Sequence, residues 1–255
     1  MKSLETWSSI KAEVELKLEE YCDQMIHDAD EIGSGYGDLW REIKSLINAG
    51  GKRIRPYLVC LTYAAYEGSD REKIIQIACS WELLHTCLLI HDDIIDRDII
   101  RHNKLNISGK YQERYKKLID KDSEHYSMSA ALLAGDLMLL SSYDIVDRSS
   151  ASSNIKSQVR KYLRQAFFSS GGGELMDIES AFYPIKSSYP ITIANYKTAV
   201  YSFQLPMVCG AMVAGASEEE LKKLGSIGRE VGVAFQLRDD LLGVFGNSTL
   251  TNQGG

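Results

Sequence analysis

Residues 71–98 read REKIIQIACSWELLHTCLLIHDDIIDRD, a long apolar run that ends in four aspartates. The apolar residues are too continuous for a surface helix and indicate a helix that is buried on most of its sides. Asp92 and Asp96 are four residues apart, so a helix places both carboxylates on one face, where like charges lower its stability by about 0.2–0.5 kcal/mol. The stretch therefore predicts a core helix whose acidic end faces a positively charged partner.

The rest of the chain shows the same helical periodicity. We expect helices over residues 7–25, 36–48, 56–67, 127–147, 154–182, 191–215 and 218–245. Ser217 and Glu220 have the spacing of a capping box, and Gly50 and Gly51 suit the end of the second helix. Pro206 is expected to kink a helix interior.

No stretch alternates with period two, so no strands are expected, and residues 102–126 are predicted to be a loop or a poorly packed short helix. The predicted fold class is all-α. We expect residues 1–255 to form one domain, a bundle of long antiparallel helices.

Composition limits the classes of function. The chain has 255 residues, 44% of them hydrophobic, and a formal net charge of −6, which does not favour a nucleic-acid-binding protein. Its five cysteines show no C-x-x-C spacing, which is typical of free buried thiols in a reducing compartment. The N-terminal residues are too charged for a signal peptide. These features predict a cytoplasmic protein.

Residues 198–217 raise the question of a membrane span, because this stretch has no charged residue and is long enough to cross a bilayer. It also contains Gln204, Pro206 and several hydroxyl groups. We favour a buried core helix over a membrane span, and expect no stable membrane insertion.

The aspartates are the first candidates for chemistry. Carboxylates at positions 92 and 96 could bind Mg²⁺, which prefers oxygen ligands and retains several waters. The alternative is a solvated acidic helix end, but Asp92 follows a buried apolar stripe. A second pair, Asp239 and Asp240, could face the first across one cavity, as carboxylates do in helix-bundle metal sites.

Metal ions held by few carboxylates complete their shell with water and substrate phosphates, so phosphate-binding cations are the next candidates. The segment GGKRIRP supplies Lys52, Arg53 and Arg55 beside glycines whose N–H groups are accessible. Taken alone, such a segment is more often a solvated helix end. His85 on its apolar face is likewise more often a core histidine than a ligand.

Taken together, GGKRIRP, ELLHT leading into HDDIIDRD, GGGELMD, YKTAVYS and FQLRDD resemble the trans-isoprenyl diphosphate synthases, the polyprenyl synthetase family. The resemblance runs over about residues 40–246, with the segments in the family's order. It implies the isoprenoid synthase fold, with helices around a central active-site cavity. It also implies a homodimer and a prenyltransferase that joins isopentenyl diphosphate to an allylic diphosphate, head to tail and in trans geometry.

The resemblance assigns roles to individual residues. Asp92, Asp96 and Asp239 would bind three Mg²⁺ ions with substrate, and Asp93 would support the first pair. Arg101 and Lys197 would bind the allylic diphosphate. Isopentenyl diphosphate would be bound by Lys52, Arg55 and His85. The cavity near the reacting carbons would be lined by Thr198 and Gln236.

Some positions depart from the family pattern. His102 stands where the family usually has a second arginine, which puts one isopentenyl diphosphate contact in doubt. Glu174 replaces a frequent glutamine and adds a carboxylate near the metal ions. Family members generally continue for several helices beyond the second aspartate motif, so we expect either a fragment or an active site open to water.

In this family, residues below the first aspartates set product length. Cys87 and Leu88 stand there and neither is aromatic, so we expect a product of geranylgeranyl length or longer. Two alternatives remain open, a class I terpene cyclase and a non-catalytic regulatory subunit. The cyclase would not need the second diphosphate site, and the intact aspartates argue against the subunit.

Overall fold

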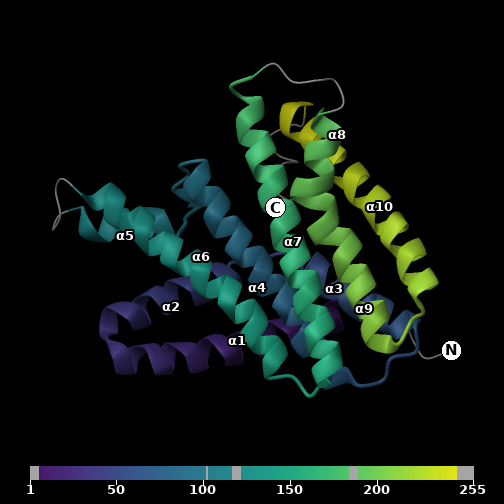
Figure 1. Cartoon of the computed structure of the whole chain (residues 1–255). Coiled ribbons are helices and arrows are strands. Elements are labelled where there is room, and N and C mark those ends of the chain that lie inside the picture. Colours follow the sequence, from purple (N-terminus) through teal and green to yellow (C-terminus); the bar gives the residue numbers. More distant parts are fainter. Residues whose placement is uncertain (1–5, 102, 117–121, 184–188, 246–255) are drawn as a thin grey trace.

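Helix α4 (Arg71–Ile95) forms the centre of the fold in the computed structural model (Figure 1). Asp70 caps its first turn by accepting a hydrogen bond from the Lys73 N–H. The helix is surrounded by α1, α3, α5, α6, α7 and α9, and Trp81 at its middle is fully buried. Its acidic end therefore concentrates carboxylates on a helix that apolar packing encloses along most of its length.

The structure describes residues 6–101, 103–116, 122–183 and 189–245. Helices α1 (Trp7–Ile32) and α2 (Ser34–Asn48) form an antiparallel pair beneath the bundle, followed by α3 (Ile54–Ala65) (Figure 1). After α4 the order is β1 (Ile100–Arg101), β2 (Lys104–Leu105), α5 (Ile107–Tyr115), α6 (Ser123–Asp147), α7 (Ser153–Ser180), α8 (Tyr189–Ile193), η1 (Ala194–Gln204), α9 (Leu205–Ala214) and α10 (Glu218–Phe245). The all-α prediction is confirmed, as is the capping box, in which Glu220 accepts from the Ser217 N–H at 2.8 Å.

The predicted helix over residues 191–215 has three parts. After α8, η1 is a π-helix, and Pro206 stands at the second position of α9. Proline has no N–H and its ring clashes with the carbonyl four residues earlier, so a regular α-helix cannot run through it unchanged. We expected a kink at Pro206. Instead, the wider turns of the π-helix precede Pro206 and accommodate the missing hydrogen bond. The π-helix also brings Lys197, Thr198 and Tyr201 to the interior side of the bundle.

Residues 100–105 correct the expectation that no strands are present. Ile100 pairs with Leu105 and Arg101 with Lys104 in a short antiparallel ladder. Two-residue strands are too short to show period-two alternation. Helix α5 after them is also better packed than predicted, since Ile107 and Tyr111 are buried. The hairpin turns the chain back over α4 and places the Arg101 guanidinium beside the aspartates.

Small residues hold α10 close to η1. A Cβ on Gly232 would lie 2.6 Å from the Ala199 Cα, and one on Gly228 would lie 2.9 Å from the Gln204 Cα. Larger side chains would separate the two helices. This close packing fixes the position of Gln236 and Asp239, which follow on α10.

Two helices, α4 and α6, are long and apolar enough to cross a membrane by length and composition. The apolar window of α4 is 72% buried inside the protein and that of α6 is 50% buried. The buried share of α4 identifies it as a core helix. Residues 198–217 are not among the candidate spans in the described part of the chain, and their helices lie in the bundle.

Arg53 joins the loop before α3 to α4. Its guanidinium donates to Glu82 at 2.7 Å and to the Ile47 carbonyl at 2.6 Å, and both charged side chains are buried. Arg53 has φ 50°, a left-handed conformation that this anchored side chain holds in place. The second cation of GGKRIRP is therefore structural.

We expect Glu82→Gln to lower the free energy of unfolding by about 2 kcal/mol, because it removes the closer of the two carboxylates that pair with the buried Arg53, the other being Glu15 at 3.4 Å. Urea unfolding followed by circular dichroism measures the change. Arg41→Ala, which removes an exposed pair with Asp30, is the control and should cost under about 1 kcal/mol. Equal losses in the two variants would contradict a structural role for the buried pair.

Candidate active site

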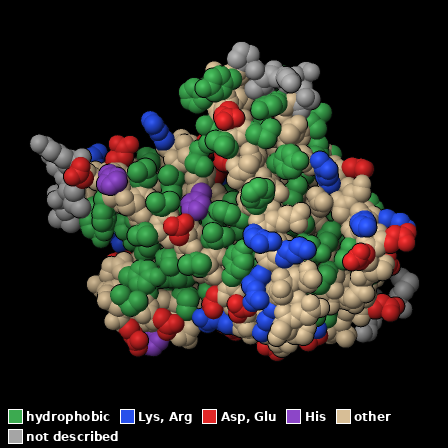
Figure 2. Space-filling model, viewed as in Figure 1, with side chains coloured by type: hydrophobic (Ala, Val, Ile, Leu, Met, Phe, Trp, Pro, Cys, Tyr) green, Lys and Arg blue, Asp and Glu red, His purple; other side chains and the backbone are tan. Residues whose placement is uncertain are grey.

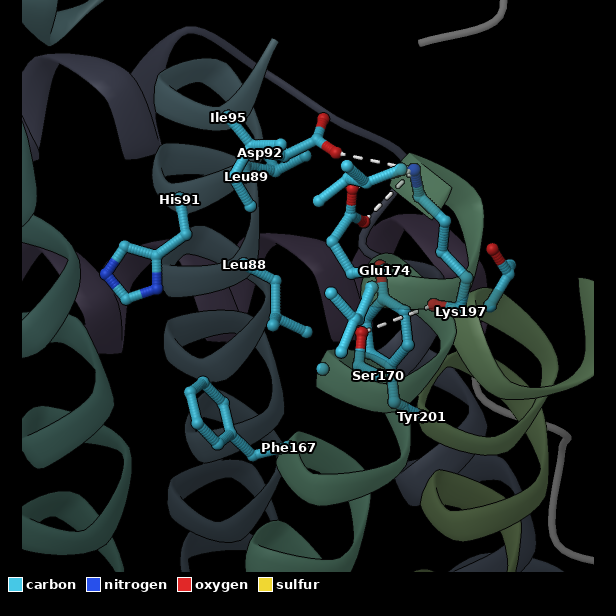
Figure 3. Close-up of a pocket in the computed structure, with 14 residues that line it drawn as sticks. Leu88, Leu89, His91, Asp92, Ile95, Phe167, Ser170, Glu174, Lys197 and Tyr201 are labelled. Carbon is cyan, nitrogen blue, oxygen red and sulfur yellow. Dashed lines mark hydrogen bonds and ion pairs between the residues drawn. The ribbon is translucent and has the colours of Figure 1, made fainter. Parts of the chain in front are cut away.

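Two adjoining cavities lie at the acidic end of α4. The first has a volume of about 350 Å³ and opens between α4, α7 and η1 (Figure 3). The second, about 270 Å³, lies between the loop before α3, α4, the β1 strand and α10. Leu89 lines both. The walls of the first also include Leu88, Asp92, Phe167, Glu174, Lys197 and Tyr201, and those of the second Lys52, Arg55, His85, Arg101 and Asp239.

The three aspartates of the first motif occupy different environments. Asp92 lies at the mouth of the first cavity (Figure 3). Asp93 is buried and accepts hydrogen bonds from Arg101, with 2.8 Å between its Oδ1 and the Arg101 Nε. Asp96 is exposed and caps the C-terminus of α4, which ends at Ile95. Asp92 and Asp96 were predicted to share one helix face. In the structure Asp92 lies within the last turn of α4, and Asp96 is the residue that follows the helix.

Electrostatics reflect this crowding. Burial raises the pKa of Asp96, and the carboxylate of Asp92 raises it further. Burial also raises the pKa of Asp93, against the opposing effect of the Arg101 guanidinium. The acidic end of α4 therefore holds more negative charge than it can stabilise alone, which favours binding of a cation.

Lys197 is the centre of a second group of charges. Its Nζ lies 2.6 Å from Asp177, 3.0 Å from Glu174 and 3.7 Å from Asp92. Burial lowers the pKa of Lys197, but its ion pairs outweigh this effect and the pKa is raised overall. Burial raises the pKa of Glu174, against the attraction of Lys197. Glu174, which stands where the resemblance leads us to expect a glutamine, thus forms an ion pair with Lys197, the residue predicted to bind the allylic diphosphate.

The second cavity gathers the cations predicted to bind isopentenyl diphosphate. Arg55 donates to the Tyr201 hydroxyl at 2.9 Å and to Ser202 Oγ at 2.7 Å, and its guanidinium lies 4.6 Å from the centre of the Tyr201 ring. Lys52 is exposed at the rim. These cations and the β1 arginine give the cavity a positive wall suited to an anion.

His85 contributes a neutral imidazole to this wall. Burial, together with the charges of Arg55 and Arg101, holds the pKa of His85 well below its ordinary value. Its Nδ1 lies 3.5 Å from the Tyr201 hydroxyl. His85 is thus both packed in the core and exposed to the cavity, so the two interpretations of this residue are compatible. His102, the departure from the family's second arginine, lies outside the described residues.

The structure places the second aspartate motif in a different cavity from Asp92, and not across one shared cavity as predicted. Asp239 lines the second cavity, and burial raises the pKa of its carboxyl. Thr198 donates to Gln236 Oε1 at 2.6 Å, and Gln236 donates to Asp240 at 2.7 Å. Thr198 lines the first cavity, whereas Gln236 links it to the second motif.

The carboxylates fit Mg²⁺ with help from a substrate. Among the residues that the structure describes, no three His, Cys, Asp or Glu side chains are grouped closely enough to hold a metal ion by themselves. Mg²⁺ is commonly held by one or two carboxylates, with waters and phosphates completing its octahedron. Asp92 in one cavity, Asp239 in the other and Asp96 at the exposed end of α4 are hard oxygen donors of this kind.

The two predicted chain-length residues lie on different sides of α4. Leu88 lines the first cavity (Figure 3). Cys87 is fully buried, with its Sγ 3.8 Å from His91 Nδ1 and next to the Leu139 backbone on α6, and does not line this cavity. The role of both in product length stays a prediction, and only Leu88 can contact a molecule in the first cavity directly.

Sequence reasoning gave no role to Tyr201, although it touches both cavities. Its ring lines the first cavity and its hydroxyl contacts Arg55 and His85 of the second. Tyr201 follows Lys197 by four residues, which places it on the same side of the helix, and this spacing was the available signal. Phe167 on α7 was missed as well.

His85 makes stability depend on pH. The unfolded imidazole titrates near about pH 6.5, whereas the folded one stays neutral to a lower pH. Between the two values the unfolded state binds more protons, so the free energy of unfolding falls as pH falls. We expect His85→Gln to remove this loss, which amounts to up to about 1.4 kcal/mol per pH unit between the two pKa values.

Urea unfolding of both proteins between about pH 7 and about pH 5 measures this difference. His27→Gln is the control, because its side chain is 71% exposed and should leave the slope unchanged. If the free energy of unfolding of His85→Gln fell with pH as steeply as that of the wild type, the neutral, buried state of His85 would be wrong.

Known proteins of similar sequence point to one family. The sequence pattern of the family described as polyprenyl synthetase matches residues 39–255. A short chain isoprenyl diphosphate synthase of Methanocaldococcus jannaschii is 33% identical over 211 residues, which cover 82% of this chain and 58% of that protein. A geranylgeranyl diphosphate synthase of Sulfolobus acidocaldarius is 28% identical over 236 residues, covering 89% of this chain and 66% of that one.

The fold agrees. The crystal structure of geranylgeranyl pyrophosphate synthase from Corynebacterium glutamicum, complexed with isoprenyl diphosphate and magnesium, matches with a TM-score of 0.84 and 29% identity. The match covers 94% of this chain and 70% of that chain. The chain spans about three fifths of the length of the curated relatives, 58% and 66% for the two described. With its pattern matched over most of the sequence, the chain belongs to the polyprenyl synthetase family.

Proposed function

We propose that this chain condenses isopentenyl diphosphate with an allylic diphosphate, head to tail, to give a longer trans-polyprenyl diphosphate. One observation carries the proposal: a cation-lined cavity adjoins an apolar cavity with a carboxylate at its mouth, and Leu89 lines both. A reaction between two diphosphates needs two anion sites around one reacting centre. A terpene cyclase binds only one diphosphate, so it would have no use for the cavity that Lys52 and Arg55 line.

Each cavity would hold one substrate. Lys52, Arg55 and His85 would bind the isopentenyl diphosphate, with the two cations supplying charge and the neutral imidazole a single hydrogen-bond donor. Lys197, which lines the first cavity, and Arg101, which lines the second but pairs with Asp92 of the first, would bind the allylic diphosphate. Both now form ion pairs with carboxylates, so binding exchanges a carboxylate partner for a phosphate.

Mg²⁺, held by Asp92, Asp96 and Asp239 with three ions in the full complex, would neutralise charge on the leaving diphosphate oxygens. The allylic C–O bond breaks and its electron pair leaves with the diphosphate. The isopentenyl double bond supplies the pair for the new C–C bond to the allylic carbon, and a proton is lost to restore a double bond. Asp93 would hold Arg101 in place, and Thr198 and Gln236 would position the reacting carbons.

Other features support a product length, a cellular location and a domain organisation for this chain. Relatives named as geranylgeranyl diphosphate synthases support a product of that length or near it. The free cysteines, all five buried, support a reducing, cytoplasmic location. We propose that the 255 residues act as one domain.

Product analysis tests the function directly. The purified chain is incubated with isopentenyl diphosphate, Mg²⁺ and each allylic diphosphate in turn, and products are identified by mass spectrometry. We expect elongated diphosphates from the wild type and a loss of at least about 100-fold in Asp92→Asn, because an electrostatic group at the leaving diphosphate contributes several kcal/mol.

Asp28→Asn is the matched control, since this aspartate lies on α1 and accepts a hydrogen bond from Gln24. It should leave turnover unchanged. Cyclised hydrocarbon from the allylic substrate alone would make the protein a cyclase. Binding of both diphosphates without any product would favour a regulatory subunit.

We propose that two copies form a homodimer through α6 and α7. Met128, Leu132, Leu133 and Leu140 on α6 are 44–66% exposed, and Phe168 on α7 is 81% exposed. Figure 2 shows hydrophobic side chains gathered on this face. An apolar surface of this extent is typical of an interface between subunits.

Light scattering coupled to size exclusion should give a mass near 57 kDa, twice the 28.5 kDa of the chain. Leu132→Glu buries a charge in the interface and should yield monomers. Leu16→Glu, at a 59% exposed position on α1, should remain dimeric. A monomeric wild type would exclude the dimer.

A further inference from the structure

The ammonium group of Lys197 is shared by carboxylates from two helices. Its Nζ lies 2.6 Å from Asp177 and 3.0 Å from Glu174, both on α7, and 3.7 Å from Asp92 on α4. We propose that Glu174 occupies Lys197 in the absence of substrate and thereby makes anion binding in the first cavity dependent on Mg²⁺. The inference deepens the proposed function and rests on it, because it concerns a residue assigned to the allylic diphosphate.

Glu174 differs from Asp177 in its position relative to the first cavity. Glu174 lines this cavity together with Lys197 and Asp92, whereas Asp177 does not line it. Figure 3 shows the ion pairs that Lys197 forms there with Asp92 and Glu174. The side chain of Glu174 is 17% exposed, against 43% for Asp177. An anion that enters the cavity and approaches Lys197 therefore meets the carboxylate of Glu174 at the same ammonium group.

The backbone keeps Glu174 and Lys197 together. A Cβ on Gly173, the residue before Glu174, would collide with the Lys197 backbone nitrogen, so α7 and η1 are in direct contact there. Ser170, one turn earlier on α7, donates a hydrogen bond to the Lys197 carbonyl at 3.3 Å. Because both backbones are fixed, Lys197 can leave Glu174 only by turning its side chain, and an incoming phosphate must compete with the carboxylate for it.

The local charge makes this competition unfavourable for a diphosphate alone. Lys197 has one positive charge, and three carboxylates lie within 3.7 Å of it. A diphosphate that takes Lys197 from Glu174 leaves a half-buried carboxylate without its partner, beside a second anion. When Mg²⁺ is present, Glu174 repels the diphosphate but attracts the cations that accompany it, so the two effects offset each other. Glu174 would thus oppose metal-free binding and change binding with Mg²⁺ little.

Glu174→Gln tests this role, because it removes the charge and keeps the size of the side chain. Lys197 retains its closer partner Asp177, so the contact between α7 and η1 should persist. Calorimetry with farnesyl thiolodiphosphate, a non-reactive probe, gives its dissociation constant in EDTA and at saturating Mg²⁺. We expect Glu174→Gln to bind the probe at least about tenfold tighter than the wild type in EDTA, and within about threefold of the wild type with Mg²⁺. Measurable binding by the variant beside a wild type too weak to measure also meets the first expectation.

Two further variants separate the local charge from other effects. Glu179→Gln makes the same change of charge on the same helix, at an exposed position that lines neither cavity. It should bind the probe as the wild type does under both conditions. Glu174→Asp keeps the carboxylate and should therefore keep the weak binding in EDTA.

The outcomes distinguish this inference from the proposed function. Equal affinity of Glu174→Gln and the wild type in EDTA would overturn the role of Glu174, and so would a gain of the same size in Glu179→Gln. A loss of affinity in Glu174→Gln at saturating Mg²⁺ well beyond threefold would also overturn it, because Glu174 would then act by binding the metal ions. If the wild type neither bound the probe with Mg²⁺ nor elongated any primer, the proposed function itself would fail.

Discussion

The structure depends on how charge is balanced at the end of a buried helix. Helix α4 is enclosed by apolar packing along most of its length, yet it ends in carboxylates that burial destabilises. Arg101 reaches them only because the β1–β2 hairpin folds back over the helix, and Lys197 only because η1 lies alongside. Removing charged groups from water is costly unless they are paired. The hairpin and the π-helix are therefore as necessary to the site as the aspartates.

The same balance describes how the site is prepared for its substrates. Around the mouth of the first cavity, four carboxylates share two cations: Asp92, Asp93, Glu174 and Asp177 face Arg101 and Lys197. A diphosphate alone would add negative charge to a site that already has an excess of it. In the proposed reaction, divalent cations would therefore have to arrive with the diphosphate, and Glu174 would strengthen this requirement because a glutamine would bring no charge. The charges of the chain itself would then couple the binding of the proposed substrate to that of the metal.

Much of this arrangement could be predicted from the sequence, and the failures have physical causes. Amphipathic spacing and capping residues predict the helices because each depends on contacts between near neighbours. The ordered motifs predicted many of the residues that line the cavities, but Asp96, Gln236 and Cys87 line neither. The hairpin was missed because two-residue strands have no period. The structural role of Arg53 was missed because its partner, Glu82, is 29 residues away. Such pairings form only when the helices pack.

The place of Phe167 in the first cavity was missed for the same reason, because it depends on how the helices pack. Cys87 and Leu88, just before Asp92, were predicted from the family resemblance to set product length. In the fold, however, α4 contributes only one wall, and its residue Cys87 faces α6. The deep end is reached from α7, whose register is fixed where Glu174 and Ser170 contact Lys197. The contacts of Lys197 with Ser170 and Glu174 therefore fix the position of α7 at the charged end of the cavity, and with it the position of Phe167 at the apolar end.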